Sequence, residues 1–333
     1  MGMNFTAIVG SMFSTPPSMI APLLSTPWTI VSAGNATPAQ VKSAQAFVNA
    51  PLSLLTNASN AKLYQYGYTG YPESEVVSIP KQMAVCNCHQ STVPIAEYVM
   101  ATILEWNVKL RAQDAAMREA CWSAGPPGNT CAQSRTALRQ TKSQTLGILG
   151  YGHIGQAIAQ RAAGFEMRII ATDIAAQVPP PAPLSWLGDD SRNPQLFAES
   201  DFVVVALPLL NTTKGLVDTP LLGRLAKTSV LINIARGPIV SEQALYDALS
   251  SGAIGGAVLD VWWNDIFRIP AGTYGPSSWP SALRFDKLPN VIMTPHDSGD
   301  SAESLHEALS EVAANLDNLA LGRPLENVVR PPQ

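Results

Sequence analysis

Clustered positive charge is missing from this 333-residue sequence. Its 21 lysines and arginines are outnumbered by 25 aspartates and glutamates, so the formal net charge is −4 at pH 7 and the pI is near 5.6. Proteins that bind nucleic acids need grouped lysines and arginines to displace counterions from phosphates. We therefore expect no nucleic-acid partner, and we expect a small neutral or anionic metabolite as the ligand.

Charge is absent altogether before Lys42, yet this stretch cannot be a membrane-spanning helix. Proline interrupts it at positions 16, 17, 22 and 27, and proline breaks helices. The stretch also lacks the arginine-rich composition of a transit peptide and the basic start with an unbroken apolar run of a secretory signal. We expect no membrane association and a cytoplasmic location.

Cysteine is scarce, with four residues at positions 86, 88, 121 and 131. Zinc sites usually separate paired ligands by two to four residues, whereas only Asn87 stands between Cys86 and Cys88. We therefore expect free thiols in a reducing compartment and no metal site.

The length exceeds what one hydrophobic core usually organises, and it predicts two domains. In the first hundred residues, apolar runs predict strands at 5–9, 28–31, 52–55 and 61–66. A helix is predicted to begin at Pro38, with the apolar residues Val41, Ala44, Phe47 and Val48 at helical spacing. Strands that alternate with helices indicate a parallel sheet covered on both faces.

A second alternation follows one long helix, predicted from Ile95 to about Cys121. Its strands are runs rich in valine and isoleucine, as fully buried parallel strands are. They are predicted at 145–149, 168–172, 202–207, 229–234, 256–260 and 291–294.

The sequence Gly150-Tyr151-Gly152-His153-Ile154-Gly155 follows the first of these strands and opens a helix. A Gly-x-Gly-x-x-Gly pattern is weak evidence alone, and this context strengthens it. Gly150 permits a tight turn, Gly152 lets the backbone approach a pyrophosphate, and Gly155 allows close helix–strand packing. The helix N-terminus offers N–H groups to the phosphates. The sequence thus predicts a dinucleotide-binding turn, in which His153 has the plain alternative of a solvated side chain.

Asp173 stands at the end of the next strand, where a carboxylate can accept hydrogen bonds from both hydroxyls of a ribose. No cation occurs in residues 174–177 to bind the 2′-phosphate of NADP. Asp173 therefore favours NAD, with capping of a loop as the alternative role.

Three later strands end in the segments 233–237, 259–265 and 293–296, which carry an arginine, carboxylates and a histidine. Ligands bind at the carboxyl ends of strands in open α/β sheets. A cation can hold the carboxylate of a 2-keto acid and polarise its carbonyl, and an imidazolium can supply the proton. A neighbouring carboxylate would raise the pKa of the histidine and fix its orientation. Each residue alone also fits an ordinary structural role.

Together these segments resemble the D-isomer-specific 2-hydroxyacid dehydrogenase family, from about Ala61 to the C-terminus. The motifs are the turn 150–155 with Asp173, Leu207-Pro208-Leu209 followed by Thr213, the run 233–237 continuing into 244–245, and Thr294-Pro295-His296. In the first domain, residues 67–70 resemble the family's glycine-bearing loop that presents N–H groups to the substrate carboxylate. Residues 93–97 resemble the start of its interdomain helix.

The resemblance implies an α/β fold of two doubly wound parallel-sheet domains. A Rossmann NAD-binding domain (101–298) would be inserted into a flavodoxin-like substrate, or catalytic, domain (1–100, completed by 299–333). It also implies a homodimer.

The resemblance further implies that Arg236 binds substrate, that His296 is the acid/base, and that Asp265 takes the place of the glutamate that orients the histidine. The implied substrate contacts are Tyr68, Thr69, Gly70 and Arg236. The implied cofactor contacts are Gly150, Gly152, His153, Ile154, Gly155, Asp173, Leu207, Pro208, Thr213, Ile234, Ala235, Arg236, Asp260 (on the nicotinamide side), His296 and Gly299.

Two departures from the family pattern stand out. Asp265 is shorter than the usual glutamate, so it reaches His296 only through a backbone shift or a bridging water. The segment 266–288 is longer than the family's loop and carries Phe267, Tyr274, Trp279 and Phe285. It either folds over the site with Trp262 and Trp263 or forms a packing or dimer surface.

The expected activity is reduction of a 2-keto acid by NADH with His296 as the proton donor. Formate dehydrogenases share the fold and resemble 260–262 and 293–299, but carry glutamine at position 265. Phosphite dehydrogenases resemble 92–94, but carry lysine at position 69. A corepressor-like protein that senses NAD without catalysis is the third alternative.

Overall fold

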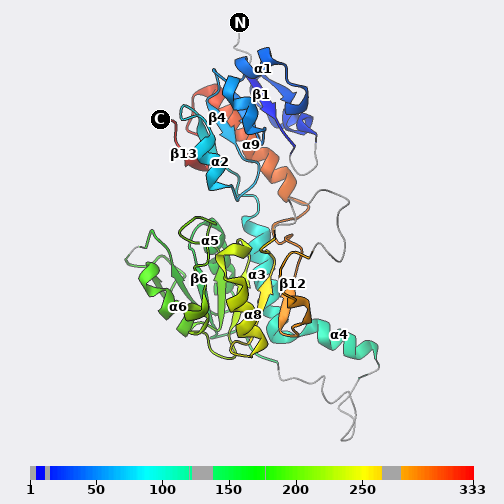
Figure 1. Cartoon of the computed structure of the whole chain (residues 1–333), viewed down its shortest axis with the longest axis vertical. Coiled ribbons are helices and arrows are strands. Elements are labelled where there is room, and N and C mark those ends of the chain that lie inside the picture. Colours follow the sequence, from blue (N-terminus) through cyan, green and yellow to red (C-terminus); the bar gives the residue numbers. More distant parts are fainter. Residues whose placement is uncertain (1–4, 12–15, 120, 122–137, 177, 265–278) are drawn as a thin grey trace, which may run out of the picture. The chain divides into compact units, whose positions relative to one another are not determined.

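The computed structural model describes residues 5–11, 16–119, 121, 138–176, 178–264 and 279–333. The chain divides into two compact units (Figure 1). Unit 1 comprises residues 1–94 and 299–333, and unit 2 comprises residues 95–298.

Unit 1 contains a six-stranded sheet in the order β13-β5-β4-β3-β1-β2. Five strands are parallel, and only the terminal β13 runs antiparallel, against β5. The strands are β1 (Phe5–Val9), β2 (Trp28–Ser32), β3 (Ala46–Val48), β4 (Leu63–Gln65), β5 (Ala84–Cys86) and β13 (Val328–Arg330).

Helices cover both faces of this sheet, because alternate strand residues are buried on opposite sides. Ala7, Val9 and Leu63 pack in one core with the long helix α9 (Ser304–Leu321), whereas Ile8 and Phe47 pack in the other. The remaining helices of unit 1 are η1 (Pro17–Leu23), η2 (Ala33–Asn35), α1 (Pro38–Ser43), η3 (Leu52–Asn57) and α2 (Glu73–Ser78).

Two predicted elements of unit 1 are wrong. Phe47 and Val48, expected in a helix, lie in β3, and the expected strand 52–55 is the 3-10 helix η3. The helix α1, capped by Thr37 and Gln40, ends at Ser43. Since all three residues of β3 are buried, its apolar run carries no strand periodicity and fits a helix equally well.

Unit 2 contains a seven-stranded, wholly parallel sheet in the order β12-β11-β10-β9-β6-β7-β8. All six predicted strands are present, and the short edge strand β8 was not predicted. The strands are β6 (Thr145–Leu149), β7 (Arg168–Thr172), β8 (Trp186–Gly188), β9 (Phe202–Val205), β10 (Val230–Asn233), β11 (Gly256–Leu259) and β12 (Val291–Met293). The expected fold class is confirmed.

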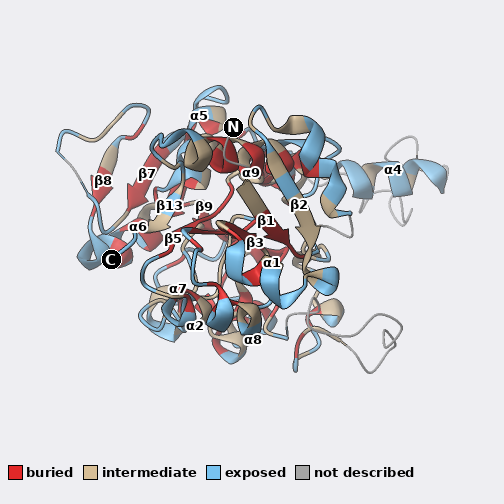
Figure 2. Ribbon diagram, turned by 90° about the horizontal axis from the view of Figure 1, so that it is seen from above, coloured by how far each residue is buried: buried red, intermediate tan, exposed pale blue. Residues whose placement is uncertain are grey.

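The predicted helix 95–121 is in fact two helices, α3 (Thr92–Val108) and α4 (Leu110–Arg118). Lys109 between them has a left-handed backbone (φ 56°), which interrupts the helix. Leu110, expected on the buried face, is 61% exposed, and Figure 2 shows α4 mostly in the colour of exposed residues. The other helices are α5 (His153–Ala163), η5 (Asp190–Arg192), α6 (Asn193–Glu199), α7 (Thr219–Leu222), η6 (Gly237–Ile239), α8 (Glu242–Ser250) and η8 (Phe285–Lys287).

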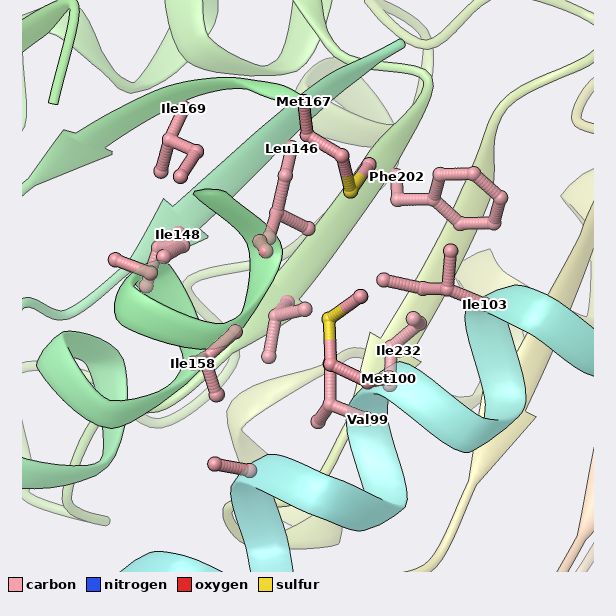
Figure 3. Packing of buried hydrophobic residues seen from close by; sticks show 14 of the residues in the cluster. Val99, Met100, Ile103, Leu146, Ile148, Ile158, Met167, Ile169, Phe202 and Ile232 are labelled. Carbon is pink, nitrogen blue, oxygen red and sulfur yellow. The ribbon is translucent and has the colours of Figure 1, made fainter. Parts of the chain in front are cut away.

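Helix α3 forms part of the core of unit 2. Figure 3 shows Val99 and Ile103 of α3 pointing toward the side chains of the sheet, and they share a buried cluster with Leu146 of β6 and Ile158 of α5. This packing fixes α3 and α5 against the same face of the sheet.

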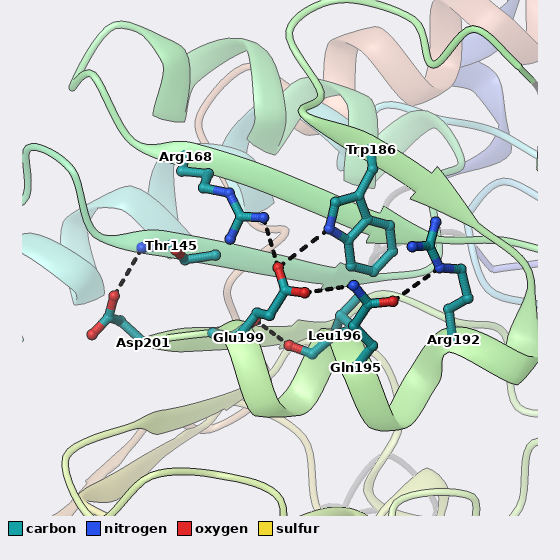
Figure 4. Close-up of polar contacts among 9 residues, drawn as sticks. Thr145, Arg168, Trp186, Arg192, Gln195, Leu196, Glu199 and Asp201 are labelled. Carbon is teal, nitrogen blue, oxygen red and sulfur yellow. Dashed lines mark hydrogen bonds and ion pairs between the residues drawn. The ribbon is translucent and has the colours of Figure 1, made fainter.

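A polar network holds the edge strand β8 (Figure 4). The Glu199 carboxylate accepts hydrogen bonds from Gln195 (2.5 Å), Arg168 (2.6 Å) and the Trp186 indole (3.4 Å). The hydrogen bonds from Gln195 and Arg168 hold the pKa of Glu199 below its ordinary value. The network ties β8 and α6 to β7.

The cysteines do not all match the expectation of free thiols. Cys86 and Cys88 are free and buried, and burial raises the pKa of Cys86 to about 12. Cys121, in contrast, is disulfide-bonded. Cysteine spacing does not specify pairing, which is why the sequence could not show this. Within the described ranges, no helix is both long and apolar enough to cross a membrane.

Candidate active site

The glycine turn between β6 and α5 needs glycine for two steric reasons. Gly150 has φ +103°, and a Cβ there would lie 2.7 Å from the carbonyl oxygen of Ala206. A Cβ at Gly155 would lie 2.3 Å from the carbonyl oxygen of Gly150, so only glycine lets α5 approach the turn this closely. A Cβ at Gly152 would meet nothing within 4 Å, so the turn is open at this position.

Helix α5 begins directly at this opening. Gly152 is its N-cap and provides no side-chain cap, so no side chain of that residue covers the first N–H groups. His153 is exposed in the first turn, whereas Ile154 packs partly against the core. The open, uncapped glycine turn at the end of β6 fits a phosphate group.

The Asp173 carboxylate is held beside this turn. One oxygen accepts a hydrogen bond from the backbone N–H of Tyr151 (2.8 Å), and the other accepts one from the N–H of Ala175 (2.8 Å). The backbone N–H of Asp173 itself donates to the carbonyl of Gly188 (2.9 Å), the last residue of β8. A negative charge is thus fixed at the end of β7, adjacent to the second residue of the glycine turn.

The loop after β9 carries Leu207, Pro208 and Thr213. The Thr213 hydroxyl donates to the carbonyl of Pro208 (2.6 Å) and accepts from the N–H of Leu210 (2.8 Å). The Thr213 side chain therefore stabilises the loop that follows β9. Pro208, near the start of this loop, is exposed.

The segment after β10 places Arg236. Ile234 and Ala235 are buried, and the Asn233 side chain accepts from the N–H of Ala235 (3.2 Å) and donates to the carbonyl of Arg236 (3.2 Å). A Cβ at Gly237 would lie 2.2 Å from the carbonyl carbon of Trp262, so glycine is required there. Asn233 thus fixes the backbone of the segment that carries Arg236, a role that the sequence pattern did not indicate.

The turn after β12 carries His296, whose backbone is left-handed (φ 64°). A non-glycine residue in this region is strained and must be held by its surroundings. The fully buried carboxylate of Asp260, at the end of β11, does this. It accepts hydrogen bonds from the Thr294 hydroxyl (2.6 Å), from the N–H groups of Asp297 (3.1 Å) and Ser298 (3.2 Å), and from the Ser298 hydroxyl.

Two further side chains hold Thr294 at the start of this turn. The Tyr98 hydroxyl, from α3, lies 2.7 Å from the Thr294 hydroxyl, and the Trp262 indole N–H donates to the Thr294 carbonyl (2.9 Å). Burial raises the pKa of Tyr98 to about 12, so this phenol is neutral at physiological pH. Neither Tyr98 nor the hydroxyl of Ser298 carried a signal in the sequence that pointed to this role.

Because the strands of unit 2 are parallel, most of the predicted residues of this unit lie at the carboxyl ends of the strands, on the same side of the sheet. The strands β10, β11 and β12 are neighbours and parallel, so the segments with Arg236, Asp260 and His296 leave the sheet side by side. The glycine turn and Asp173 follow the carboxyl ends of β6 and β7 on the same side of the sheet. In the strand order, only β9 lies between β6 and β10.

Part of the predicted site lies outside the described residues, namely Asp265 together with Phe267 and Tyr274. The described end of the aromatic segment packs within unit 2. Trp279 lies 5.8 Å from the Trp262 ring, and the fully buried Phe285 stacks on Trp263 at 5.2 Å. These two aromatic side chains therefore serve packing.

In unit 1, the loop after β4 carries the predicted substrate residues. The N–H of Gly67 donates to the Asn49 side chain (3.0 Å), and the carbonyl of Thr69 accepts from the Asn87 side chain (2.6 Å). Within the described ranges, the N–H groups of Thr69 and Gly70 have no hydrogen-bond acceptor. Tyr68 is exposed, with its ring 5.6 Å from that of Tyr66.

Gly299 is the first residue of the C-terminal part of unit 1. Its carbonyl accepts a hydrogen bond from the Ser304 hydroxyl (2.9 Å) at the start of α9. Across the described residues, no group of three or more histidine, cysteine or acidic side chains is arranged to hold a metal ion.

Comparison with known proteins matches this architecture to one family. The family model of the D-isomer specific 2-hydroxyacid dehydrogenase, NAD binding domain, matches residues 100–298, which is more than half of the chain. The glyoxylate reductase of Thermococcus kodakarensis is 37% identical over 172 residues, covering 51% of this chain and 46% of the relative. The chain spans about half the length of the relatives it matches in sequence.

Solved structures resemble the chain over almost its whole length. A 2-hydroxyacid dehydrogenase from Ketogulonicigenium vulgare has a TM-score of 0.75 at 23% identity, covering 99% of this chain and 100% of that one. An NADPH-dependent glyoxylate/hydroxypyruvate reductase from Sinorhizobium meliloti, in complex with NADP and sulfate, has a TM-score of 0.75 at 21% identity, covering 98% of each chain. These similarities show the shared fold. With the match to the family model, they establish that this chain belongs to the D-isomer specific 2-hydroxyacid dehydrogenase family.

Proposed function

We propose that this protein is an NAD(H)-dependent D-2-hydroxyacid dehydrogenase that reduces a 2-keto acid. One observation carries the proposal. The carboxyl ends of the parallel strands of unit 2 carry the open glycine turn (after β6), the fixed Asp173 carboxylate (after β7), Arg236 (after β10) and the His296 turn held by Asp260 (after β12). The names of the matched relatives, glyoxylate reductase, glycerate dehydrogenase and hydroxypyruvate reductase, support the same reaction class.

The proposed cofactor site lies at the carboxyl ends of β6 and β7. The glycine turn and the first turn of α5 would hold the pyrophosphate, and Asp173 would accept hydrogen bonds from the adenosine ribose. Bound NADH supplies the hydride that reduces the substrate carbonyl.

The chain's own residues supply binding and the proton. The Arg236 guanidinium would pair with the substrate carboxylate and polarise the carbonyl next to it. The imidazolium of His296 would donate its proton to the carbonyl oxygen as the hydride reaches the carbonyl carbon. Asp265 keeps its proposed role of orienting His296. The N–H groups of Thr69 and Gly70 would be further hydrogen-bond donors for a carboxylate. We also propose that the protein forms a homodimer.

A substrate panel tests the proposed reaction. NADH oxidation is measured with glyoxylate, hydroxypyruvate, pyruvate and phenylpyruvate. We expect reduction of at least one of them, and we expect Arg236→Ala to raise its KM about a hundredfold, because the substrate carboxylate loses its charged partner. The Kd for NADH should stay within about twofold of the wild-type value.

Arg236→Lys is the matched control, since it keeps the positive charge but loses the planar fork of donors. It should have an intermediate KM. Loss of NADH affinity in parallel with keto-acid affinity would instead assign Arg236 to the cofactor, and absence of reduction with every keto acid would refute the proposed reaction.

The preference for NAD over NADP rests on Asp173. Its charge would repel a 2′-phosphate, and the cation after β8, Arg192, is already stacked on Trp186 (4.6 Å) and bonded to Gln195 (3.0 Å). We expect Asp173→Asn, which removes the charge but keeps one acceptor for Tyr151, to improve the KM for NADPH about tenfold. The KM for NADH should worsen by a few-fold.

Steady-state kinetics with both nucleotides measures this switch. A wild-type enzyme that uses NADPH as efficiently as NADH, with no change on Asp173→Asn, would contradict the assignment. Asp189→Asn is the control, because that neighbouring carboxylate is occupied with the Ser191 backbone and hydroxyl (3.0 and 2.5 Å).

A further inference from the structure

We propose that Gln90 is a specificity residue which binds a hydroxyl group on the side chain of the substrate. With Thr69 and Thr92, it forms what we call the polar subsite of unit 1. This inference rests on the proposed function, and it narrows the substrate to 2-keto acids that carry a hydroxyl group on the carbon next to the ketone.

The polar subsite contains three buried side-chain oxygens that have no hydrogen-bond partner among the residues that the structure describes. The Gln90 side chain is 4% exposed, and its carbonyl oxygen has no hydrogen-bond partner among the described residues. The hydroxyl oxygens of Thr69 and Thr92 are likewise shielded from solvent and unpartnered within the described ranges. Buried polar atoms are rarely left unpaired in proteins. Three of them in the loop after β4 and the segment from β5 to the start of α3 therefore indicate a ligand.

These oxygens belong to the loop after β4 and to the segment that leads from β5 to the first residue of α3, and hydrogen bonds join the two segments. The strands β4 and β5 are adjacent and parallel, with Gln65 opposite Cys86, so the loops that follow them leave the same edge of the sheet. The N–H of Cys88 donates to the carbonyl of Tyr68 (3.4 Å), and the Asn87 side chain donates to the carbonyl of Thr69 (2.6 Å). Thr69 from the first loop is therefore joined to the segment after β5, which carries Gln90 and leads into α3 at Thr92.

The segment that follows β5 is also held by a hydrogen bond to α9. The N–H of His89, beside Gln90, donates to the Glu311 carboxylate of α9 (2.8 Å), and the N–H of Thr92 donates to the carbonyl of His89 (3.0 Å). The Asn327 side chain occupies the same Glu311 oxygen (2.9 Å). Gln90 thus projects from a backbone that is held on both sides, as a residue that discriminates between ligands must be.

A carboxylate-binding group adjoins the subsite. The N–H groups of Thr69 and Gly70 have no acceptor within the described part of the chain, and they lie in the loop joined to that of Gln90. An acid whose carboxylate is bound by these N–H groups would place its following carbons beside the segment that follows β5. The substituent on those carbons is what the polar subsite would contact.

The chemistry of the three oxygens selects the substituent. An amide carbonyl only accepts hydrogen bonds, whereas threonine hydroxyls both donate and accept. An alcohol can donate a hydrogen bond to the Gln90 carbonyl oxygen and accept one from a threonine hydroxyl. If the Gln90 amide group is turned by about 180°, the alcohol can instead accept a hydrogen bond from its NH2 group. A methyl group would leave all the oxygens unpaired, and a site built for a hydroxyl rejects an analogue that lacks it.

The test compares hydroxypyruvate with pyruvate, which differ only by this hydroxyl. We expect the wild-type enzyme with NADH to have a kcat/KM for hydroxypyruvate at least about tenfold above that for pyruvate. Gln90→Met keeps the length of the side chain and removes its polar atoms. It should lower kcat/KM for hydroxypyruvate about tenfold, mainly through KM, and leave pyruvate unchanged or improved.

Thr92→Ser keeps a hydroxyl and should keep the wild-type ratio, whereas Thr92→Val should reduce it. Thermal unfolding midpoints check that each variant folds, and Gln90→Leu is a second apolar variant if Gln90→Met is unstable. An equal effect on both substrates, or a wild-type enzyme without preference, would overturn the polar subsite and indicate a buried water there, while leaving the proposed reaction intact. Absence of NADH-dependent reduction with either substrate would overturn the proposed function and this inference with it.

Discussion

Replacing His296 with alanine is expected to lower kcat for keto-acid reduction by about a hundredfold to ten-thousandfold, because the reaction loses its general acid. The Kd for NADH should stay within about twofold, since the glycine turn and Asp173 lie after other strands. Stopped-flow single-turnover kinetics, together with NADH fluorescence titration, measures the two quantities separately.

The backbone of His296 calls for a second variant. Alanine is strained at φ 64°, whereas asparagine tolerates the left-handed region, so His296→Asn removes the imidazole with less disturbance of the turn. Both variants should lose activity to a similar extent. If His296→Asn retained near wild-type kcat, the imidazole would not be the proton donor, and the loss in the alanine variant would come from a distorted turn.

Replacing Asp260 is expected to have the second largest effect, although this carboxylate need not touch substrate. Asp260→Ala would leave the buried donors of Thr294, Asp297 and Ser298 without an acceptor. Each such donor costs about 1–3 kcal/mol, so the free energy of unfolding should fall by at least about 3 kcal/mol. The turn that places His296 would then be free to relax from its strained conformation, and kcat should fall about a hundredfold.

Two variants separate positioning from folding. Asp260→Asn keeps the shape and one acceptor, and it should fold while shifting the pH profile of kcat, because His296 would no longer be held in one position. Ser298→Ala removes only one of the contacts and should change kcat in the same direction to a smaller extent. An Asp260→Asn enzyme with unchanged kcat and pH profile would show that the turn holds its shape without the carboxylate.

The sequence predicted those features that depend on local pattern. Six of the unit 2 strands were recognisable because they are short apolar runs, most of them buried and rich in branched aliphatic residues, and β6 and β7 have the predicted limits. The Gly150–Gly155 turn was recognisable because its glycines are required by contacts a few residues away, such as that between Gly155 and Gly150.

Prediction failed where several structures satisfy the same local pattern. The buried run 46–48 fits a helix or a strand, and its central position in the sheet, between β1 and β4, makes it β3. The edge strand β8 is too short to be recognised from its own residues, and it is held by Glu199 of α6. The break at Lys109 lies within a continuous apolar periodicity that predicted one helix.

By itself, the sequence determined the family, the fold class and the candidates Arg236, Asp173 and His296, because motif composition, motif order and strand periodicity can be read along the chain without knowing which residues touch. Only the tertiary structure decided how these residues are held. The bracing of the His296 turn by Asp260 joins residues more than thirty positions apart, and the unpartnered oxygen of Gln90 becomes visible only when burial is known. Hydrogen bonding and burial are properties of the folded chain, so no pattern of neighbouring residues could have shown them.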